Sequence, residues 1–350
     1  MVLVGNLEIG VILPGVAVQR REGITPAAAA RHVEDVGLDG VWHGDHLAIG
    51  APTLDAPIVL ATAATATSRI RIGTSVFVPA IRPLAWAAKQ IATLQYVSGD
   101  RLVLGVGSGG GAGQWAAAGV TYAQRGRRTD TALELLPRLL AGEPTRLPYE
   151  QASAATLPEE SGEPVELTPA VEHGEPVELT PAVERGEPVE LPPAIERGEP
   201  VELTPAVTMP PVWVGNASPA AIRRAARLGD GWFPSLISPR EVAEGRARLA
   251  ELAAEHGRPT PLIAIGGTSA LGDGPGLPSR EALASGIGSA YGRPLQDVID
   301  IPLTGRPEAA AERLAEYREA GATHAIIGIS GGDDWRAQVD LLAETRTLLN

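Results

Sequence analysis

Cysteine is absent from this 350-residue sequence, and so is any long apolar run. Without thiols the chain has no disulfide, no thiolate nucleophile and no thiolate metal ligand, and we expect no metal site. No stretch reaches the roughly 18 uninterrupted apolar residues that a membrane span needs. The opening MVLVGNLEIG also lacks the basic and apolar regions of a signal peptide. We therefore expect a cytoplasmic protein that has no membrane partner.

Lysine is almost absent as well, since Lys89 stands alone beside 28 arginines and the net charge is −13. A protein that neutralises nucleic-acid phosphates needs a basic face, so nucleic acid is excluded as a partner. Residues 162–203 contain eleven Glu and only two Arg, so nine of the net negative charges lie there. The rest of the chain is mildly acidic, and its charge says little about the substrate.

Strand-like apolar runs alternate with Ala-, Leu- and Arg-rich stretches, a pattern that predicts parallel βαβ units. The expected strands are Glu8–Leu13, Gly40–His43, Ile70–Val76, Leu102–Val106, Val212–Val214, Gly231–Phe233, Leu262–Ile265 and Ala325–Ile329. The expected helices are Pro26–Val36, Pro57–Ala66, Leu84–Val97, Gln124–Leu140, Pro219–Leu228, Pro239–His256, Pro307–Ala320 and Trp335–Leu349, and prolines suit the first turns of several. Eight strand–helix pairs predict an α/β fold, a single (β/α)8 TIM barrel over residues 1–350.

Two long segments interrupt this pattern. Residues 142–208, between the fourth helix and the fifth strand, contain a twelve-residue tandem repeat of the form GEPVELTPAVER. Each complete unit has at least two prolines and three glutamates, so we expect an extended surface excursion. Short stacked strands such as Val165–Leu167 and a partner-binding role are the alternatives. A helix-to-strand connection belongs to the N-terminal face of a barrel, away from the usual site of chemistry.

The second segment, residues 268–306, follows the seventh strand and is rich in Gly and Pro. It leaves the strand at the C-terminal face, where the active sites of barrels lie. A long loop there is a candidate lid over a site. The alternative is a packed surface excursion.

The end of the second strand reads Val41-Trp42-His43-Gly44-Asp45-His46. His46 begins the loop over the barrel mouth, where an imidazole can exchange a proton near neutral pH. The neighbouring carboxylate of Asp45 can orient a partner or accept a ring N–H. A purely structural histidine is the alternative interpretation.

Glycine-rich or small-residue motifs end three further strands. Gly73–Pro79 offers small residues that let a flat ligand approach the backbone, and Gly105–Gly113 offers N–H groups and the Ser108 hydroxyl for a phosphate. In Pro210–Pro219, Ser218 is expected to cap a helix whose N-terminus favours anions. A fifth motif, Ala225–Phe233, is typical of packing and turn geometry.

Together, in this order, the five motifs resemble the luciferase-like monooxygenase family, and most closely its branch of coenzyme F420-dependent oxidoreductases. The matching sequences are GVILP, GVW-x-x-DH, LGVGSGGG, PPVWVGN and RAARLGDGW, and the resemblance covers nearly the whole chain except the repeats.

The resemblance implies roles for particular residues. It places His46 and Asp45 at the cofactor ring as the catalytic pair, and a non-proline cis peptide at Ser75–Val76 behind the ring. It also implies a homodimer. The residues expected to bind the phosphate-bearing chain of the cofactor are Ser108, Gly109, Gly110, Gly215, Asn216 and Ala217.

Two positions depart from the family pattern. Gly110 stands where some sugar-phosphate-oxidising members have a glutamate, which makes that substrate class doubtful, and Asn216 replaces a glycine of many members. We expect hydride transfer between coenzyme F420 and a small organic substrate, with His46 exchanging the proton. The alternatives are an FMN-dependent monooxygenase and a non-catalytic flavin-binding homologue.

Overall fold

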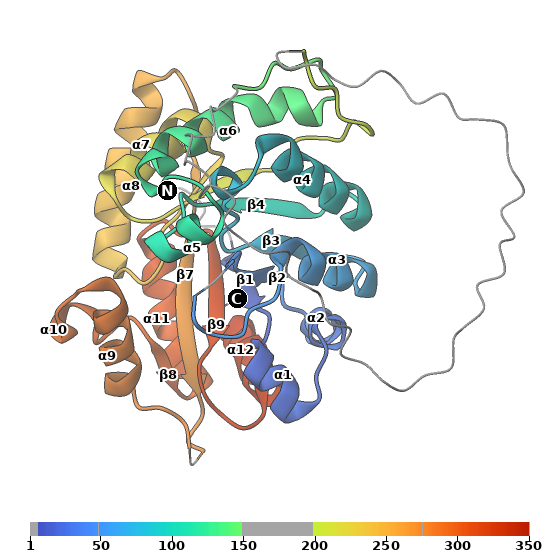
Figure 1. The fold of residues 1–350 in the computed structure, drawn as a ribbon. Helices are drawn as coiled ribbons and strands as arrows, with labels where there is room; N and C mark the ends of the chain where they lie inside the picture. The colour runs from blue at the N-terminus through green and yellow to red at the C-terminus, as the bar shows by residue number, and fades with distance from the viewer. Residues whose placement is uncertain (1–5, 48, 149–198, 275, 350) are drawn as a thin grey trace, which may run out of the picture.

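The computed structural model describes residues 6–47, 49–148, 199–274 and 276–349 of the chain (Figure 1). The complete repeats of the insertion fall within residues 149–198, so the expectations for their structure lie outside the described residues. Within the described ranges, none of the helices combines the length and the apolar character needed to cross a bilayer.

Eight parallel strands close into a barrel, which confirms the predicted fold. Neighbouring strands pair in chain order from β1 to β7, β9 pairs with both β7 and β1, and the β6–β7 pairing completes the ring. The barrel strands are β1 (Glu8–Ile12), β2 (Gly40–His43), β3 (Arg71–Thr74), β4 (Leu102–Val106), β5 (Val212–Gly215), β6 (Gly231–Phe233), β7 (Leu262–Leu271) and β9 (His324–Ile329).

Eight helices cover the outside of the barrel at the predicted places (Figure 1). They are α2 (Pro26–Asp35), α3 (Ala56–Ala66), α4 (Leu84–Ser98), α6 (Arg125–Leu140), α7 (Pro219–Leu228), α8 (Pro239–Glu255), α11 (Pro307–Glu319) and α12 (Trp335–Leu349). Prolines open α2, α7, α8 and α11, as expected, because a first-turn residue needs no N–H donor. The Ser218 hydroxyl caps α7 by accepting from the Ala221 N–H at 3.3 Å.

The structure adds elements that the sequence pattern did not predict. Helix α1 (Val16–Glu22) buries none of its residues, so its sequence has no apolar periodicity that would predict a helix. Helix α5 (Ala112–Ala117) begins inside a glycine-rich run, which is typical of a loop. Two short 3-10 helices, η1 (Pro79–Ile81) and η2 (Tyr122–Gln124), occur in the loops after β3 and β4.

The predicted lid segment is more ordered than a loop. Strand β7 continues through Leu271, and its end pairs with a ninth strand, β8 (Leu303–Gly305). Between them lie α9 (Arg280–Tyr291) and α10 (Leu295–Val298), which form a separate group beside the barrel in Figure 1. The predicted end of the strand at Ile265 was therefore wrong, and the lid role stays a prediction.

The described ends of the insertion are held together at their base. Thr145 and Val201 exchange backbone hydrogen bonds of 3.0 and 2.9 Å in an antiparallel bridge. Leu147 and Glu199 line a cavity that Arg82 and the start of α4 also line. Because helices run antiparallel to the barrel strands, the start of α4 belongs to the C-terminal side. We had expected the insertion to lie at the N-terminal face, but its described ends extend to the C-terminal side.

Aromatic rings fill the barrel interior. Trp42 stacks on Trp213 with 6.2 Å between ring centroids, and Phe233 meets the edge of Trp213. A Cβ at Gly10 or Gly73 would lie 2.0 Å from the Trp42 indole, so these glycines provide the space that this ring occupies. The glycine of the Gly73–Pro79 motif therefore accommodates Trp42 and does not open the backbone to a ligand.

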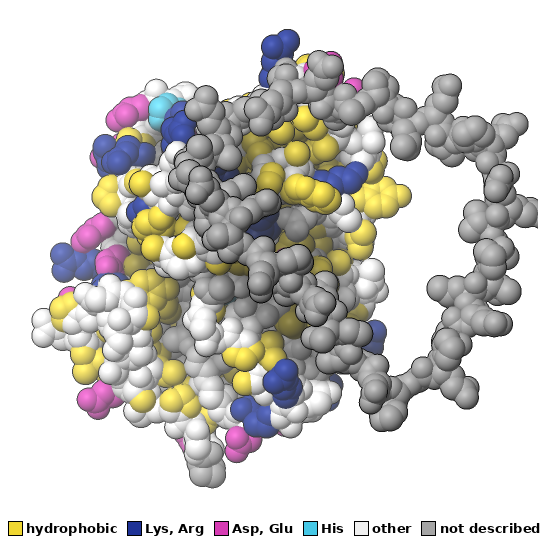
Figure 2. Space-filling view, in the orientation of Figure 1, with side chains coloured by type: hydrophobic (Ala, Val, Ile, Leu, Met, Phe, Trp, Pro, Cys, Tyr) yellow, Lys and Arg dark blue, Asp and Glu magenta, His cyan; other side chains and the backbone are white. Residues whose placement is uncertain are grey.

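Ion pairs follow the outer surface of α8, including Arg240–Glu244 and Arg248–Glu251, both at 2.8 Å. Figure 2 shows side chains of both charge signs along that side of the molecule. Exposed pairs of this kind contribute little to stability, so the burial of the apolar core is the larger source of it.

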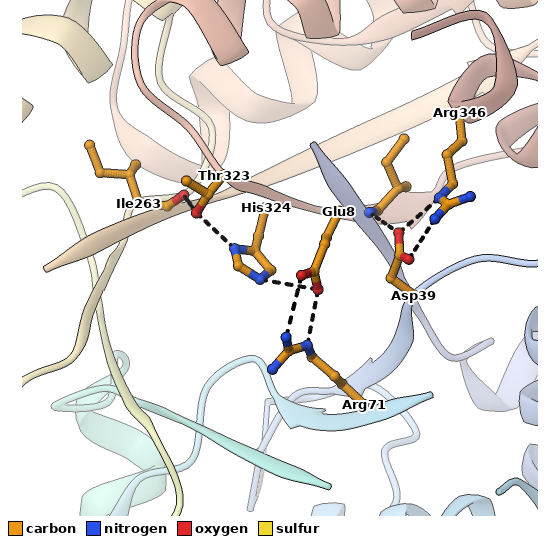
Figure 3. A network of polar contacts seen from close by, with 8 residues as sticks. Glu8, Asp39, Arg71, Ile263, Thr323, His324 and Arg346 are labelled. Carbon is orange, nitrogen blue, oxygen red and sulfur yellow. Dashed lines mark hydrogen bonds and ion pairs between the residues drawn. The ribbon is translucent and has the colours of Figure 1, made fainter. Parts of the chain in front are cut away.

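A polar cluster joins the N-terminal ends of three barrel strands (Figure 3). The Glu8 carboxylate accepts from Arg71 Nε at 3.0 Å and lies 3.2 Å from His324 Nε2, whose ring also contacts Trp213. Next to this cluster, Asp39 accepts from the Ile9 N–H and from Arg346 of α12. This end of a barrel is typically devoted to stability, and the cluster ties the first and last strands together.

The Glu8 cluster predicts a loss of stability in acid. The hydrogen bond and charge of His324, with those of Arg71, outweigh burial and lower the pKa of Glu8 to about 2. A carboxyl whose pKa is depressed on folding stabilises the protein above its unfolded pKa, and that stability disappears between about pH 4.5 and pH 2. Since the Glu8 carboxylate is partly exposed, we expect about 1–2 kcal/mol, well below the full linkage value.

Urea unfolding at several pH values measures this loss. Glu8→Gln should be less stable than the parent protein at pH 6, and the difference should shrink to about a quarter of that value at pH 2.5. The difference between the parent protein and Glu251→Gln, a variant in an exposed pair, should show no such pH dependence. An equal pH dependence in the parent protein and in Glu8→Gln would contradict the assignment.

Candidate functional site

A pocket of about 1150 Å³ opens at the carboxyl ends of the barrel strands. Its walls come from the segments after β2, β3, β4, β5 and β6, from the first turn of α8, and from the end of α9 with Arg293 after it. Every residue that the sequence placed at the site lines this one pocket: Asp45, His46, Ser75, Val76, Ser108, Gly109, Gly110, Gly215, Asn216 and Ala217.

Val76 forms the part of the pocket wall where β3 ends. The Ser75–Val76 peptide is cis, as the resemblance implied. A Cβ at Gly107 would lie 2.4 Å from Val76 Cγ2, and one at Gly215 would lie 2.8 Å from Val76 Cγ1. Two glycines from neighbouring strand ends thus make room for the two methyl groups of Val76.

Replacing Gly107 by alanine should displace Val76. Overpacking of this kind costs about 1–3 kcal/mol in unfolding free energy, and the altered wall should weaken ligand binding in the pocket. Replacing Val76 by alanine in the same protein should restore much of the lost stability, because it removes the clashing methyl groups. Gly113→Ala is the matched control, because a Cβ there meets no atom within 4 Å. Equal stability of Gly107→Ala and Gly113→Ala in urea unfolding would contradict the packing argument.

The glycine-rich loop after β4 forms a cradle on one side of the pocket. Gly109 and Gly111 have φ values of 67° and 74°, in the left-handed region that favours glycine. A Cβ at Gly110 would meet nothing within 4 Å, so the loop leaves open space along the pocket there. Ser108 lies beside it and adds a hydroxyl to the lining.

Asn216 keeps the backbone conformation that a glycine would have at the end of β5. Its φ is 86°, and asparagine is among the few non-glycine residues that tolerate this region. The side-chain oxygen of Asn216 accepts from the Ser218 N–H at 2.8 Å, and the backbone carbonyl of Asn216 accepts from Trp232 Nε1 at 2.9 Å. The departure from the family's glycine therefore preserves the turn that leads into α7.

His46 is exposed on the pocket wall, at the start of the loop after β2. Gln114 of α5 fixes this loop, because its side chain accepts from the Leu47 N–H at 2.9 Å and donates to the Gly110 carbonyl at 3.2 Å. The loop that carries the imidazole is thereby tied to the glycine-rich loop.

Asp45 is buried and paired with Arg82. Arg82 Nη2 lies 2.8 and 2.7 Å from the two carboxylate oxygens, and the Val78 N–H donates to Oδ2 at 3.0 Å. The Arg82 guanidinium also lies 4.5 Å from the Phe77 ring centroid. The carboxylate thus contacts the chain segment that follows Val76, while its role in proton transfer stays a prediction.

A second ion pair, which is partly buried, lines the pocket, and in it Arg293 contacts Glu241 at 2.8 Å. Burial raises the pKa of Glu241, but hydrogen bonds from Ser238 and the charge of Arg293 outweigh it and hold the pKa below its usual value. Arg293 also donates to the Leu236 carbonyl at 3.1 Å. Both charged pairs of the pocket are therefore already neutralised within the protein.

His43 is the last residue of β2, three positions before His46, and it does not line the pocket. Burial lowers the pKa of His43, and the charge of His46 adds to this effect. The partly buried His43 therefore has a structural place in the motif Val41–His46, while the catalytic role of His46 stays a prediction.

A comparison with known protein families identifies the chain. The model of the family described as luciferase-like monooxygenase matches residues 25–275, which is most of the sequence. The chain belongs to the luciferase-like monooxygenase family. The expected resemblance is thus confirmed at the level of the family.

Individual relatives align over shorter stretches. A 4-hydroxyprotoasukamycin monooxygenase of Streptomyces nodosus subsp. asukaensis is 34% identical over 116 residues, 33% of this chain and 31% of that protein. An F420-dependent glucose-6-phosphate dehydrogenase of Amycolatopsis mediterranei is 41% identical over 95 residues, 26% of this chain and 28% of the relative. The chain thus spans about a third of the length of these two luciferase-like relatives.

Solved structures with this fold use two kinds of cofactor. An F420-dependent secondary alcohol dehydrogenase with a bound F420–acetone adduct aligns at a TM-score of 0.68 and 16% identity, over 99% of this chain and 100% of that one. The oxygenating constituent of 3,6-diketocamphane monooxygenase of Pseudomonas putida, with FMN, aligns at 0.64 and 16% identity, over 97% of each chain. At these identities the likeness establishes the fold alone.

Several pocket residues of this luciferase-like chain were missed by sequence reasoning. They are Arg82, Gln114, Trp115, Ser235, Leu236, Glu241, Tyr291 and Arg293. Ser235 and Leu236 follow β6, and the rule that sites lie at the carboxyl ends of parallel strands could have found them. Arg82 lies in the loop after β3 and the others lie in helices or just after α9, and no local motif marks them.

Proposed function

We propose that the protein is an oxidoreductase that transfers a hydride between coenzyme F420 and a small organic substrate. The observation that carries the proposal is the state of the ionisable groups that line the pocket. Asp45 and Glu241 are each held by an arginine, which leaves the His46 imidazole and the Tyr291 phenol as possible proton carriers among the described lining residues, and of these two the imidazole is suited to neutral pH. An imidazole exchanges protons near neutral pH, as an alcohol–ketone interconversion requires.

The pocket fits a phosphate-bearing tricyclic cofactor. Its volume of about 1150 Å³ exceeds the roughly 300–1,000 Å³ of common small-molecule sites. Trp115 Nε1, buried beside the glycine-rich loop, has no hydrogen-bond partner among the described residues. Val76 would contact the ring, and Ser108, Gly109, Gly110 and the Gly215–Ala217 turn would hold the phosphate-bearing chain. When bound, the deazaflavin would supply the carbon that exchanges the hydride.

The chain's own residues provide position and proton transfer. His46 would donate a proton to the substrate oxygen during reduction and accept it during oxidation. Gln114 holds the His46 loop against the glycine-rich loop, and Arg82 holds Asp45 against the Val78 backbone. A fixed arrangement of this kind lowers the entropy cost of bringing the reacting groups together.

The names of the relatives support both this proposal and its main rival. The dehydrogenase relatives use F420, whereas the FMN-bound neighbour is a monooxygenase. The motif set GVW-x-x-DH, LGVGSGGG and PPVWVGN favours the F420 branch. An FMN-dependent monooxygenase is the second candidate.

Titration of the full-length protein with F420 and with FMN, followed by fluorescence, separates the candidates. We expect F420 to bind at least about ten-fold more tightly than FMN, with no oxygen consumption during turnover of an alcohol and ketone panel. Tighter FMN binding with substrate-dependent oxygen consumption would support the monooxygenase. Tight F420 binding without turnover across the panel would instead indicate a non-catalytic homologue.

A further inference from the structure

Three large apolar side chains are exposed around the mouth of the pocket. Leu47 is 54% exposed, Ile49 46% and Tyr291 56%, and all three line the pocket. They come from two segments far apart in the sequence, the loop after β2 and the end of α9. Large apolar side chains left exposed around a concave site are typical of a surface that binds an apolar ligand.

The charged groups of the same pocket are paired with one another. Arg82 contacts Asp45 at 2.7 Å, and Arg293 contacts Glu241 at 2.8 Å. A substrate carboxylate or phosphate would have to compete with these internal partners, and it would lose its own hydration on entering. Among the described lining residues, no arginine remains without an acidic partner.

The uncharged parts of the lining that suit an anion are the loop from Gly107 to Gly111 and the turn from Gly215 to Ala217, and the phosphate-bearing chain of the cofactor would occupy both under the proposed function. With both taken, the substrate meets mainly Leu47, Ile49, Tyr291 and the His46 imidazole. The rest of the lining combines the aliphatic side chains of Ile81, Leu236 and Ile237 with Gln114, Ser235 and the two internally paired arginines.

We infer that the substrate is an uncharged, largely apolar organic molecule, and that Leu47, Ile49 and Tyr291 select it. The inference rests on the proposed function in one respect, the placement of the cofactor along the glycine-rich loop. It extends that function by naming the class of substrate and the residues that recognise it.

Binding to the full-length protein with F420 bound, measured by ligand-observed NMR, tests the inference without requiring turnover. The first probes are 2-hexanone and 5-oxohexanoate, which share a chain and differ by a terminal carboxylate. We expect the ketone to bind at least about ten-fold more tightly than the acid. Affinity should also rise about three- to four-fold for each CH2 from 2-butanone to 2-octanone, the factor for transferring one CH2 out of water.

Two variants with a matched control locate the effect. Leu47→Ala should weaken 2-octanone binding about three- to ten-fold, whereas Leu348→Ala should not change it, because Leu348 is 50% exposed on α12 and outside the pocket lining. Glu241→Gln should raise the affinity for 5-oxohexanoate about ten-fold and leave 2-hexanone unchanged, because it removes the charge that neutralises Arg293. Glutamine can still complete the capping box at Ser238, so α8 should stay folded.

The outcomes distinguish this inference from the proposed function. Failure of F420 to bind would overturn the proposed function. F420 binding combined with equal or tighter binding of the acid, or with no dependence on chain length, would overturn the inference alone. An equal effect of Leu47→Ala and Leu348→Ala would overturn the assignment of the selecting residues.

Discussion

His46→Ala should lower turnover by about 10²-fold or more while F420 affinity changes by no more than a few-fold. Proton transfer by a positioned side chain typically contributes a factor of about 10²–10⁴, and alanine removes the proton carrier without removing a buried contact. His46 is exposed on the pocket wall, so its loss should leave the unfolding free energy nearly unchanged. The rate is followed by F420 absorbance with the best substrate of the alcohol and ketone panel.

Two controls make this result specific. His256→Ala changes an exposed histidine that lies beyond α8, outside the pocket lining, and should leave the rate unchanged. Added imidazole should restore part of the activity of His46→Ala, because the small molecule can occupy the space of the missing side chain and carry the proton. Unchanged turnover in His46→Ala would remove His46 from the mechanism.

The positions of the barrel strands were predictable from the sequence because buried parallel strands are short apolar runs bounded by turn residues. The same reasoning located the pocket, since parallel strands deliver their following loops to one end of the barrel. Ser108 and Asn216, far apart in the sequence, reach one pocket for that reason.

The extension of β7 was not predictable from the apolar pattern. The run Gly266-Gly267-Thr268-Ser269 is typical of a loop, yet it pairs with β9 along its length. A Cβ at Gly266 would lie 2.4 Å from the Ser235 Oγ, so this glycine permits a close approach between strand ends. The hydroxyls of Thr268 and Ser330 form a hydrogen bond of 2.6 Å, so the polar side chain of Thr268 finds a partner within the protein.

The partners of the acidic pocket residues were also beyond the sequence. Asp45 pairs with Arg82, 37 positions away, and Glu241 pairs with Arg293, 52 positions away. Any of the 28 arginines could have served, because local patterns set element type but not side-chain contacts across elements. Because Asp45 contacts Arg82 and the Val78 N–H, it is a candidate positioning residue and not only a partner of His46.

Asp45→Ala should destabilise the protein by about 3–5 kcal/mol, because it leaves the Arg82 guanidinium without its carboxylate. The Asp45 side chain is only 5% exposed and that of Arg82 18%, so water cannot replace the lost partner easily. The Val78 N–H loses its acceptor in the same variant. Urea unfolding measures the loss.

Three comparisons test the cause of that loss. Asp273→Ala, in an exposed pair with Arg306, should change stability by less than about 1 kcal/mol. The double variant Asp45→Ala with Arg82→Leu should be more stable than Asp45→Ala, because it no longer buries an unpaired charge. If Asp45 acts only by holding Arg82 and the Val78 N–H, Asp45→Asn should lose stability and activity together. If Asp45→Asn instead kept full stability and lost turnover, the carboxylate would act with His46 in the chemistry, and its contact with Arg82 would serve to hold it there.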